Sequence, residues 1–391
     1  MKKVRSEEMK HSTIRLLLLL AVALLLNACS DDPETEQLGQ RKVLAVEPYY
    51  ASFLNVEKIT RSLPDGFTLY ENLYPSTIAS QATIGLFQTY PSSTGSVPVS
   101  STVKYVNETW TTTQAITIST KPCYIYGFMP SNSDFVAGTP TATPLNGNFA
   151  NGAIINIPGL STLSPADVCV VVGAAKGKST NDITTTGVIK PGNFSYDDTT
   201  GDDGSEKIYL LLDHLYAGLH FKMHLDADYA NLRSIVVKEV KLTTLEKIST
   251  TIDLTVHLTA NSTGSSPLTS VDYSTASSAV DYATITLFPY DENITEFSVP
   301  VNTPQDFLSC FAPGSCHNFE LTSTYDVYDK QGNLIRRDCV AHNKINTAGF
   351  YGYDNLRAGE IYTINLKIQP TFLYVLSDPD VDNPTIVISN N

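Results

Sequence analysis

The stretch Leu215–Leu225, LYAGLHFKMHL, indicates the fold class, because polar and apolar residues alternate along most of it. Leu219, Phe221 and Met223 fall on one face of an extended chain, and histidine or lysine stands between them. A period of two residues is typical of a strand that buries one face and leaves the other in water. The stretch therefore predicts a half-buried β-strand.

Further short strands are predicted on both sides of this one. Asp167–Val172 becomes continuously apolar after its first residue and is expected to be buried on both faces. Asp329–Gly332 separates two strands and predicts a hairpin turn, with glycine where a positive φ is least costly. Other strands are predicted at Thr83–Thr89, Cys123–Phe128, Ala153–Ile157, Lys207–Leu212, Ser234–Leu242, Ile252–Leu258, Ala283–Phe288, Phe319–Tyr328 and Gly359–Ile368. Since helical patterns are nearly absent after the N-terminal 28 residues, we expect an all-β chain with two β-sandwiches in tandem.

The N-terminal segment has the features of a secretory signal. Basic residues precede the apolar run Leu16–Leu26, which is too short to cross a bilayer comfortably. The run ends in a motif that resembles a bacterial lipobox, formed by Leu26, Asn27, Ala28 and Cys29. This predicts a lipoprotein signal peptide at residues 1–28, a lipidated Cys29 and a polar tether at residues 29–40. The alternative is an ordinary signal peptide with a chance cysteine.

The residues after the lipobox point to the cell surface. Ser30–Asp32 resembles the acidic tag that directs lipoproteins of the Bacteroidetes to the outside of the outer membrane. The chain of 391 residues has a formal net charge of −14, and an acidic surface disfavours nucleic acid as a partner. The sequence therefore predicts an exported protein in the outer membrane that does not bind nucleic acid.

The length and a change in composition predict two domains. A chain of this size exceeds one ordinary hydrophobic core. Ser179–Gly204 is rich in Thr, Asp and Gly, and it predicts a linker with the domain boundary near its end. We therefore expect an N-terminal sandwich at residues 41–206 and a C-terminal sandwich at residues 207–391.

The cysteines leave the redox state open. Besides Cys29 they are Cys123, Cys169, Cys310, Cys316 and Cys339. Export permits disulfides, but an odd number leaves at least one cysteine as a thiol or paired between chains. Cys310 and Cys316 are close enough in the sequence to close a small loop. The alternative is that these cysteines act as small buried apolar residues.

No motif in the sequence assembles an active site, so we expect neither enzymatic activity nor a cofactor. HExxH, paired CxxC and serine-elbow patterns are missing. His220 and His224 share the polar face of a strand, where a solvated face is favoured over a metal site. Asp378–Asp382 has alternating carboxylates, which leaves calcium binding or an acidic surface turn open. The sequence therefore predicts no metal site.

A series of motifs occurs in order along most of the mature chain. They are the lipobox at Cys29, Thr60–Arg61 after the first strand, Ala82–Phe87 (ATIGLF), Trp110 before AITIS, the strand ending CYIYGFMP, His214–Phe221 (HLYAGLHF) and Gly359–Pro370 (GEIYTINLKIQP). In this order they resemble the fimbrillin family, the pilin-type lipoproteins of the Bacteroidales. The resemblance implies two tandem transthyretin-like β-sandwich domains and a structural role in a cell-surface fimbrium that supports adhesion.

The resemblance also implies how such a subunit assembles. A trypsin-like protease cuts the lipidated precursor after an arginine that follows the first strand. Loss of this strand opens a groove, and a strand from the C-terminal tail of a neighbouring subunit fills it, because a sheet edge presents unpaired backbone groups. In this chain the removable strand would be Val43–Val56 and the scissile residue Arg61. Arg41 is the second choice, and an ordinary loop arginine is the alternative interpretation of Arg61.

The C-terminal tail, residues 371–391, contains the candidate donor strands FLYVL and TIVI. Alternate residues give each segment an apolar face, namely Phe372, Tyr374 and Leu376 in the first and Ile386 and Ile388 in the second. Pro379 and Pro384 prevent one uninterrupted strand, and FLYVL is equally well explained by pairing within its own domain. The sequence leaves open whether the subunit would form the stalk, the tip or the anchor.

The alternative function is a surface lipoprotein that binds glycans for a polysaccharide uptake system. Such a protein would also consist of β-sandwiches and would need exposed aromatic platforms. Trp110 is the one tryptophan, although tyrosines could substitute for it. For a pilus subunit, the expected partners are other subunits by strand exchange, the outer membrane through the precursor's lipid, and host or bacterial surface ligands.

Overall fold

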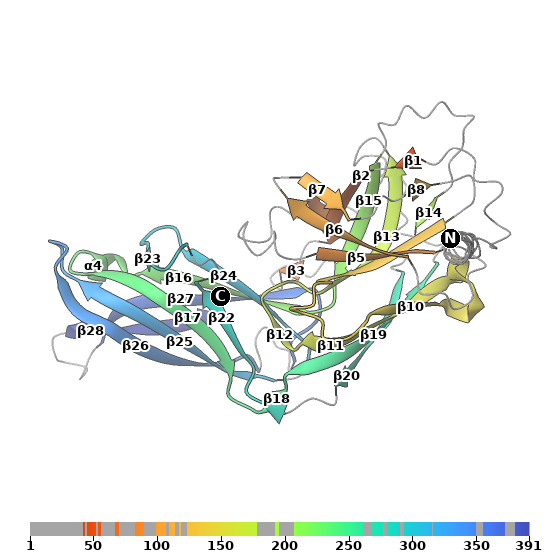
Figure 1. The fold of residues 1–391 in the computed structure, drawn as a ribbon. Coiled ribbons are helices and arrows are strands. Elements are labelled where there is room, and N and C mark those ends of the chain that lie inside the picture. Colours follow the sequence, from red (N-terminus) through yellow and green to blue (C-terminus); the bar gives the residue numbers. More distant parts are fainter. Residues whose placement is uncertain are drawn as a thin grey trace, which may run out of the picture. The chain divides into compact units, whose positions relative to one another are not determined.

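The computed structural model describes residues 42–43, 45–51, 54–55, 67–69, 83–89, 99–106, 109–113, 117–118, 123–177, 192–194, 207–260, 267–276, 280–289, 293–314, 316–348, 355–371 and 380–390. The chain divides into two compact units, residues 1–42 and residues 43–391, and all described residues except Lys42 belong to the second. The described part of this unit consists mainly of β-strands (Figure 1), which confirms the all-β prediction. Within the described ranges, no helix is long and apolar enough to cross a membrane.

The largest sheet has nine strands. They are β2 (Ala45–Ala51), β4 (Phe67–Leu69), β5 (Thr83–Thr89), β6 (Val99–Val106), β7 (Thr109–Thr112), β9 (Cys123–Met129), β13 (Cys169–Gly177), β14 (Gly192–Phe194) and β15 (Lys207–His214). Their order is β4-β2-β15-β13-β9-β5-β6-β7, and β14 pairs with β9. A four-stranded sheet accompanies it, formed in order by β10 (Thr141–Pro144), β11 (Gly152–Ser161), β19 (Thr251–Thr259) and β20 (Leu268–Thr275).

Two further sheets contain most of the remaining strands. The six-stranded sheet has the order β12 (Leu163–Ser164), β24 (Gln305–Phe311), β16 (Ala217–Leu225), β27 (Glu360–Thr371) and β28 (Asp380–Asn390), and β3 (Leu54–Asn55) pairs with β27. The five-stranded sheet has the order β22 (Thr284–Phe288), β17 (Ser234–Thr244), β25 (Asn318–Tyr328) and β26 (Leu334–Asn346), and β23 (Phe297–Ser298) pairs with β17.

The smaller elements are short. They are β1 (Lys42–Val43), β8 (Thr117–Ile118), β18 (Ile248–Ser249), β21 (Val280–Asp281), the 3₁₀ turns η3 (Leu145–Gly147) and η4 (Phe149–Asn151), and the helix α4 (Ala227–Ala230). Asp226 caps α4, because its side chain accepts hydrogen bonds from the backbone N–H groups of Asp228 and Tyr229. The helix therefore begins where the Asp226 side chain can accept hydrogen bonds from first-turn N–H groups that have no partner within the helix.

Two hydrophobic cores hold the sheets together. One joins side chains from the nine-stranded and four-stranded sheets, including Tyr126, Ile155 and Leu254. The other joins the six-stranded and five-stranded sheets, including Phe221 and Leu242. β16, β17, β19 and β25 bury alternate residues toward these cores, which is why their sequences show a period of two.

The structure confirms the half-buried strand that was predicted within Leu215–Leu225. β16 spans Ala217–Leu225, and Leu219, Phe221 and Met223 are at most 1% exposed. β25 and β26 form the expected hairpin, and Gly332 in its turn has φ +82. The Asp329 carboxylate accepts hydrogen bonds from backbone N–H groups of this turn, which fixes its shape.

Strand pairing crosses the domain boundary predicted at residue 206. β19 and β20 follow that residue but extend the four-stranded sheet beside β11 (Figure 1). β12 precedes it and pairs with β24. The division at residue 206 and the transthyretin-like topology stay predictions.

The predicted strand Val43–Val56 is divided in the structure. β2 pairs with β15 in the nine-stranded sheet, whereas β3 pairs with β27 in the six-stranded sheet. An apolar extended pattern shows that a segment can be a strand but not which neighbour it will meet. The structure therefore differs from the prediction in the pairing partners of this segment, and a sequence pattern does not specify pairing partners.

Candidate functional site

The N-terminal strand β2 occupies a slot between β15 and β4. It runs parallel to β15, with Ala45 opposite Lys207 and Tyr50 opposite Leu212, and antiparallel to β4. The other described pairs of the nine-stranded sheet are antiparallel. β2 is thus inserted into the sheet in a direction that a hairpin connection would not produce.

β15 depends on a partner at this edge. Residues Ile208 to Leu212 are at most 5% exposed, so the strand lies deep in the unit. On its other edge it pairs with β13 from Cys169 to Gly177. If β2 left, the backbone groups of β15 that now face it would lose their partners. A sheet edge in this state can accept another strand.

The residues expected to control maturation lie outside the described part of the chain. They are Leu26, Asn27, Ala28, Cys29, Arg41 and Arg61. In the sequence Arg41 immediately precedes β1, and Arg61 lies between β3 and β4. The two arginines therefore bracket β2 along the chain.

The two donor candidates differ in what is described. Phe372, Tyr374 and Leu376 lie outside the described residues, in the segment that connects β27 to β28. Ile386 and Ile388 lie in β28, opposite Ile368 and Leu366 of β27 in an antiparallel pair. In this structure TIVI is therefore paired within its own chain.

Side chains from neighbouring elements hold β28 in place. Arg233 forms an ion pair with Asp382 at 2.6 Å, and the Tyr229 hydroxyl donates to the carbonyl oxygen of Val381 at 2.8 Å. Asn343 Nδ2 donates to the carbonyl oxygen of Ile386 at 2.9 Å. In the acidic stretch Asp378–Asp382, for which calcium binding was left open, the Asp382 carboxylate is thus paired with an arginine.

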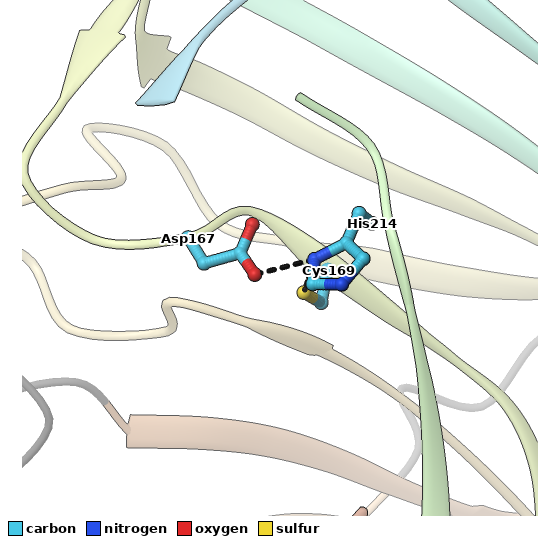
Figure 2. Close-up of side chains that lie close together, drawn as sticks. All are labelled: Asp167, Cys169 and His214. Atoms are coloured by element: carbon cyan, nitrogen blue, oxygen red, sulfur yellow. Dashed lines mark hydrogen bonds and ion pairs between the residues drawn. The ribbon is translucent and has the colours of Figure 1, made fainter. Parts of the chain in front are cut away.

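A second candidate site is a buried polar cluster of Asp167, Cys169 and His214 (Figure 2). His214 Nδ1 lies 2.5 Å from Asp167 Oδ2 and 3.5 Å from Cys169 Sγ. Cys310 Sγ lies 3.9 Å from the other carboxylate oxygen of Asp167. All four residues are at most 3% exposed.

Strand register brings this cluster together. Cys169 and His214 are directly opposite in the β13–β15 pair, and the backbone N–H of Leu215 donates to the carbonyl oxygen of Val168 at 2.7 Å. Asp167 stands two residues before Cys169 and therefore projects to the same side. Cys310 comes from β24, in the six-stranded sheet.

The cluster does not have the geometry of a catalytic triad. In a triad the nucleophile and the carboxylate contact different nitrogens of the histidine, whereas here both contacts are to Nδ1. Burial and the Asp167 carboxylate raise the pKa of the Cys169 thiol well above its ordinary value, which disfavours a reactive thiolate. The three residue types could instead hold a cation.

The sequence does not reveal this cluster as a unit. His214 stands out there only within a family motif, and Cys169 only as one of the cysteines. The available signal was the spacing of Asp167 and Cys169, which places both on one face of a strand. The position of His214 opposite them is a matter of register between segments about 45 residues apart.

His220 is paired with a carboxylate, and four of the described cysteines are thiols. His220 Nε2 lies 3.0 Å from the carboxylate of exposed Asp306, and burial lowers the pKa of this histidine. Cys310 and Cys316 are both thiols, so the small loop between them is not closed by a disulfide. Cys169 and Cys339 are thiols as well.

No protein-family model matches the chain, and no curated protein matches it by sequence. Solved structures similar to it include a candidate cell adhesion protein from Bacteroides fragilis, with 8% identity and a TM-score of 0.43 over 89% of this chain and 97% of that one. A fimbrial protein from Bacteroides vulgatus has 12% identity and a TM-score of 0.35 over 89% and 99% of the two chains. The fimbrial anchor protein Mfa2 from Porphyromonas gingivalis has 10% identity and a TM-score of 0.26 over 89% and 97%. Similarities of this size do not define the function of the chain.

Proposed function

We propose that the chain is a structural subunit of a cell-surface fimbrium, exported as a lipoprotein, matured by trypsin-like cleavage and joined to its neighbours by donor-strand exchange. The ordered sequence motifs that resemble fimbrillins support the family assignment. The observation that supports the assembly step is the position of β2 in the slot between β15 and β4.

Cleavage after Arg61 would act on this slot directly. All of β1, β2 and β3 precede Arg61 in the sequence, whereas β4 follows it. The cut would free β2 from the rest of the chain and leave both walls of the slot, β15 and β4, in the body of the protein. A cut after Arg41 would leave β2 attached, so Arg61 remains the better candidate.

The donor would be the C-terminal tail of a neighbouring subunit. FLYVL lies between β27 and β28, and TIVI lies within β28. TIVI can reach a neighbour only if β28 separates from β27, because its residues pair with that strand. β28 is an edge strand, so its separation opens the sheet at one side only.

Before cleavage, the lipid on Cys29 would hold the precursor in the outer membrane through the tether at residues 29–40. After cleavage, the fimbrium would present the subunit to host or bacterial surface ligands. A stalk subunit needs both the slot and the donor tail, whereas an anchor would keep its lipid and β2.

Limited digestion with an arginine-specific, trypsin-like protease tests the proposal. We expect one early cut after Arg61, identified by mass spectrometry of the new N-terminus, followed by growth into polymers on size-exclusion chromatography. Arg61→Gln should abolish both results. Arg337→Gln, which removes an exposed arginine of β26, should change neither.

The other outcomes discriminate between roles. Cleavage that yields polymers only when another subunit is added would point to a tip subunit or an anchor. A chain that resists cleavage, stays monomeric and binds glycans on an array would refute the fimbrial proposal in favour of the glycan-binding lipoprotein.

A further inference from the structure

We propose that Asp167, Cys169 and His214, with Cys310 as fourth ligand, form a buried structural site for a zinc-type divalent cation. The sequence predicted no metal site, and this site is independent of the fimbrial function proposed above. It combines one carboxylate, one imidazole and two sulfur ligands in a fully buried position.

The separations of the ligand atoms fit tetrahedral coordination after a small adjustment. The ligand atoms of Asp167, Cys169 and His214 all lie within 4.8 Å of one another. Bonds of about 2.0 Å to nitrogen and about 2.3 Å to sulfur put tetrahedral N and S ligands about 3.5 Å apart. The observed separation of His214 Nδ1 and Cys169 Sγ is 3.5 Å. The Asp167 oxygen is at hydrogen-bond distance, 2.5 Å, and would retreat by about 1 Å to coordinate the same cation.

The arrangement of the side chains is also consistent with the binding of one cation. Asp167 Oδ2 and Cys169 Sγ both lie near His214 Nδ1. The three side chains lie close together (Figure 2), so small movements would place their donor atoms around one cation. A simple histidine–carboxylate pair would need only one of these two contacts. Cys310 Sγ lies 3.9 Å from the other carboxylate oxygen of Asp167, which places a second sulfur atom beside the three ligands.

A bound cation would compensate most of the negative charge of these buried ligands. A buried charge is costly unless it is compensated. A divalent cation bound by the Asp167 carboxylate, the Cys169 and Cys310 thiolates and a neutral His214 reduces the charge of the buried ligand set from −3 to −1. A thiol that coordinates a divalent cation loses its proton, so both cysteines would bind as thiolates.

The ligand types select the metal. Imidazole and thiolate ligands favour zinc or a similar transition metal, whereas calcium and magnesium prefer oxygen atoms alone. Complete burial excludes an open coordination position for substrate, so the site would be structural. Since Cys169 and His214 belong to the nine-stranded sheet and Cys310 to the six-stranded sheet, the cation would link the two sheets.

Cobalt substitution of the full mature chain tests the proposal. Because the site is buried, the chain is unfolded and refolded with Co²⁺ or Zn²⁺, and unbound metal is removed by gel filtration. We expect about one metal per chain, a thiolate-to-cobalt charge-transfer band, and the intense visible bands of tetrahedral cobalt. A folded chain that retains neither metal nor the charge-transfer band would overturn the proposal.

Matched cysteine variants make the test specific to this site. Cys169→Ala should abolish metal retention, whereas Cys339→Ala, a thiol on β26, should leave it unchanged. Cys310→Ala should weaken the charge-transfer band and alter the visible bands. Equal metal retention in Cys169→Ala and the parent chain would refute the site. Spectra unchanged by Cys310→Ala would overturn its four-ligand form. Circular dichroism verifies that each variant has folded, and Asp167→Asn replaces any cysteine variant that does not fold.

Discussion

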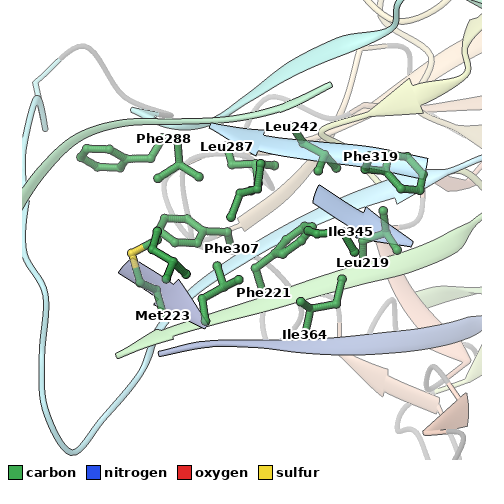
Figure 3. Close-up of a cluster of buried hydrophobic side chains, with 14 of the residues drawn as sticks. Leu219, Phe221, Met223, Leu242, Leu287, Phe288, Phe307, Phe319, Ile345 and Ile364 are labelled. Carbon is green, nitrogen blue, oxygen red and sulfur yellow. The ribbon is translucent and has the colours of Figure 1, made fainter. Parts of the chain in front are cut away.

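The packing of β28 leads to a quantitative prediction, because neighbouring residues of this strand face different surroundings. Ile386 is 6% exposed and belongs to the core between the six-stranded and five-stranded sheets, part of which is drawn in Figure 3. Val387, the next residue, is 40% exposed. Alternation along the strand therefore supplies a perturbation and its control one residue apart.

Ile386→Ala removes three buried carbon atoms. At about 0.8 kcal/mol for each buried methylene, the lost transfer free energy is about 2.4 kcal/mol. The cavity that remains adds to this loss, although an edge strand can relax to fill part of it. We expect the free energy of unfolding to fall by about 2–3 kcal/mol for Ile386→Ala, and by about 0.5 kcal/mol or less for Val387→Ala.

Urea denaturation followed by circular dichroism measures both changes. The midpoint should shift to a lower urea concentration for Ile386→Ala with an unchanged slope, since the surface exposed on unfolding stays nearly the same. If the two variants differed by less than about 1 kcal/mol, the reasoning would fail, because β28 would then not bury its inner face in this core. Its pairing with β27 within one chain would be in doubt for the same reason.

Two other predictions concern a close backbone contact and a helix cap. Gly152 has φ +131, and a Cβ there would lie 2.0 Å from the carbonyl oxygen of Leu258, so Gly152→Ala should lower the free energy of unfolding by more than about 3 kcal/mol. Gly332→Ala, at φ +82 with open space around it, should cost only about 1–2 kcal/mol in the same denaturation assay. Lys367 and the α4 cap lower the pKa of Asp226, so the stability that this carboxylate contributes is present above its ordinary pKa near 3.8 and is lost as the pH falls through the lower folded value. Asp226→Ala should therefore cost about 1 kcal/mol at pH 7 and clearly less in strong acid, and a loss that did not depend on pH would contradict the assignment.

The strands could be predicted from sequence because their signal is local. In β16 the side chains that alternate in the sequence alternate in burial, from Leu219 at 1% to the half-buried His220. The turn at Asp329–Gly332 could be predicted for the same reason, since one glycine and one carboxylate determine its shape. Each of these features depends on residues that are neighbours in the chain.

The candidate site could be predicted only in part. Val43–Val56 is extended as expected, but the parallel pairing of β2 with β15, and the separate pairing of β3, depend on segments about 160 and 300 residues further along. The chemistry of Asp167, Cys169 and His214 was present in the sequence, yet no spacing rule brings them together. Register between β13 and β15 does so, and register depends on the packing of whole strands.

Local patterns show that this chain is built of short strands. They also predict an export signal with a candidate lipid site at Cys29, and the order of the motifs resembles that of fimbrillins. These conclusions follow from local periodicity and from contiguous motifs. The folded structure alone shows which strands pair, that β2 lies between β15 and β4, and that a carboxylate, a thiol and an imidazole meet in the interior. Non-local pairing is selected by burial and backbone hydrogen bonding over the whole sheet, and no local pattern records this selection.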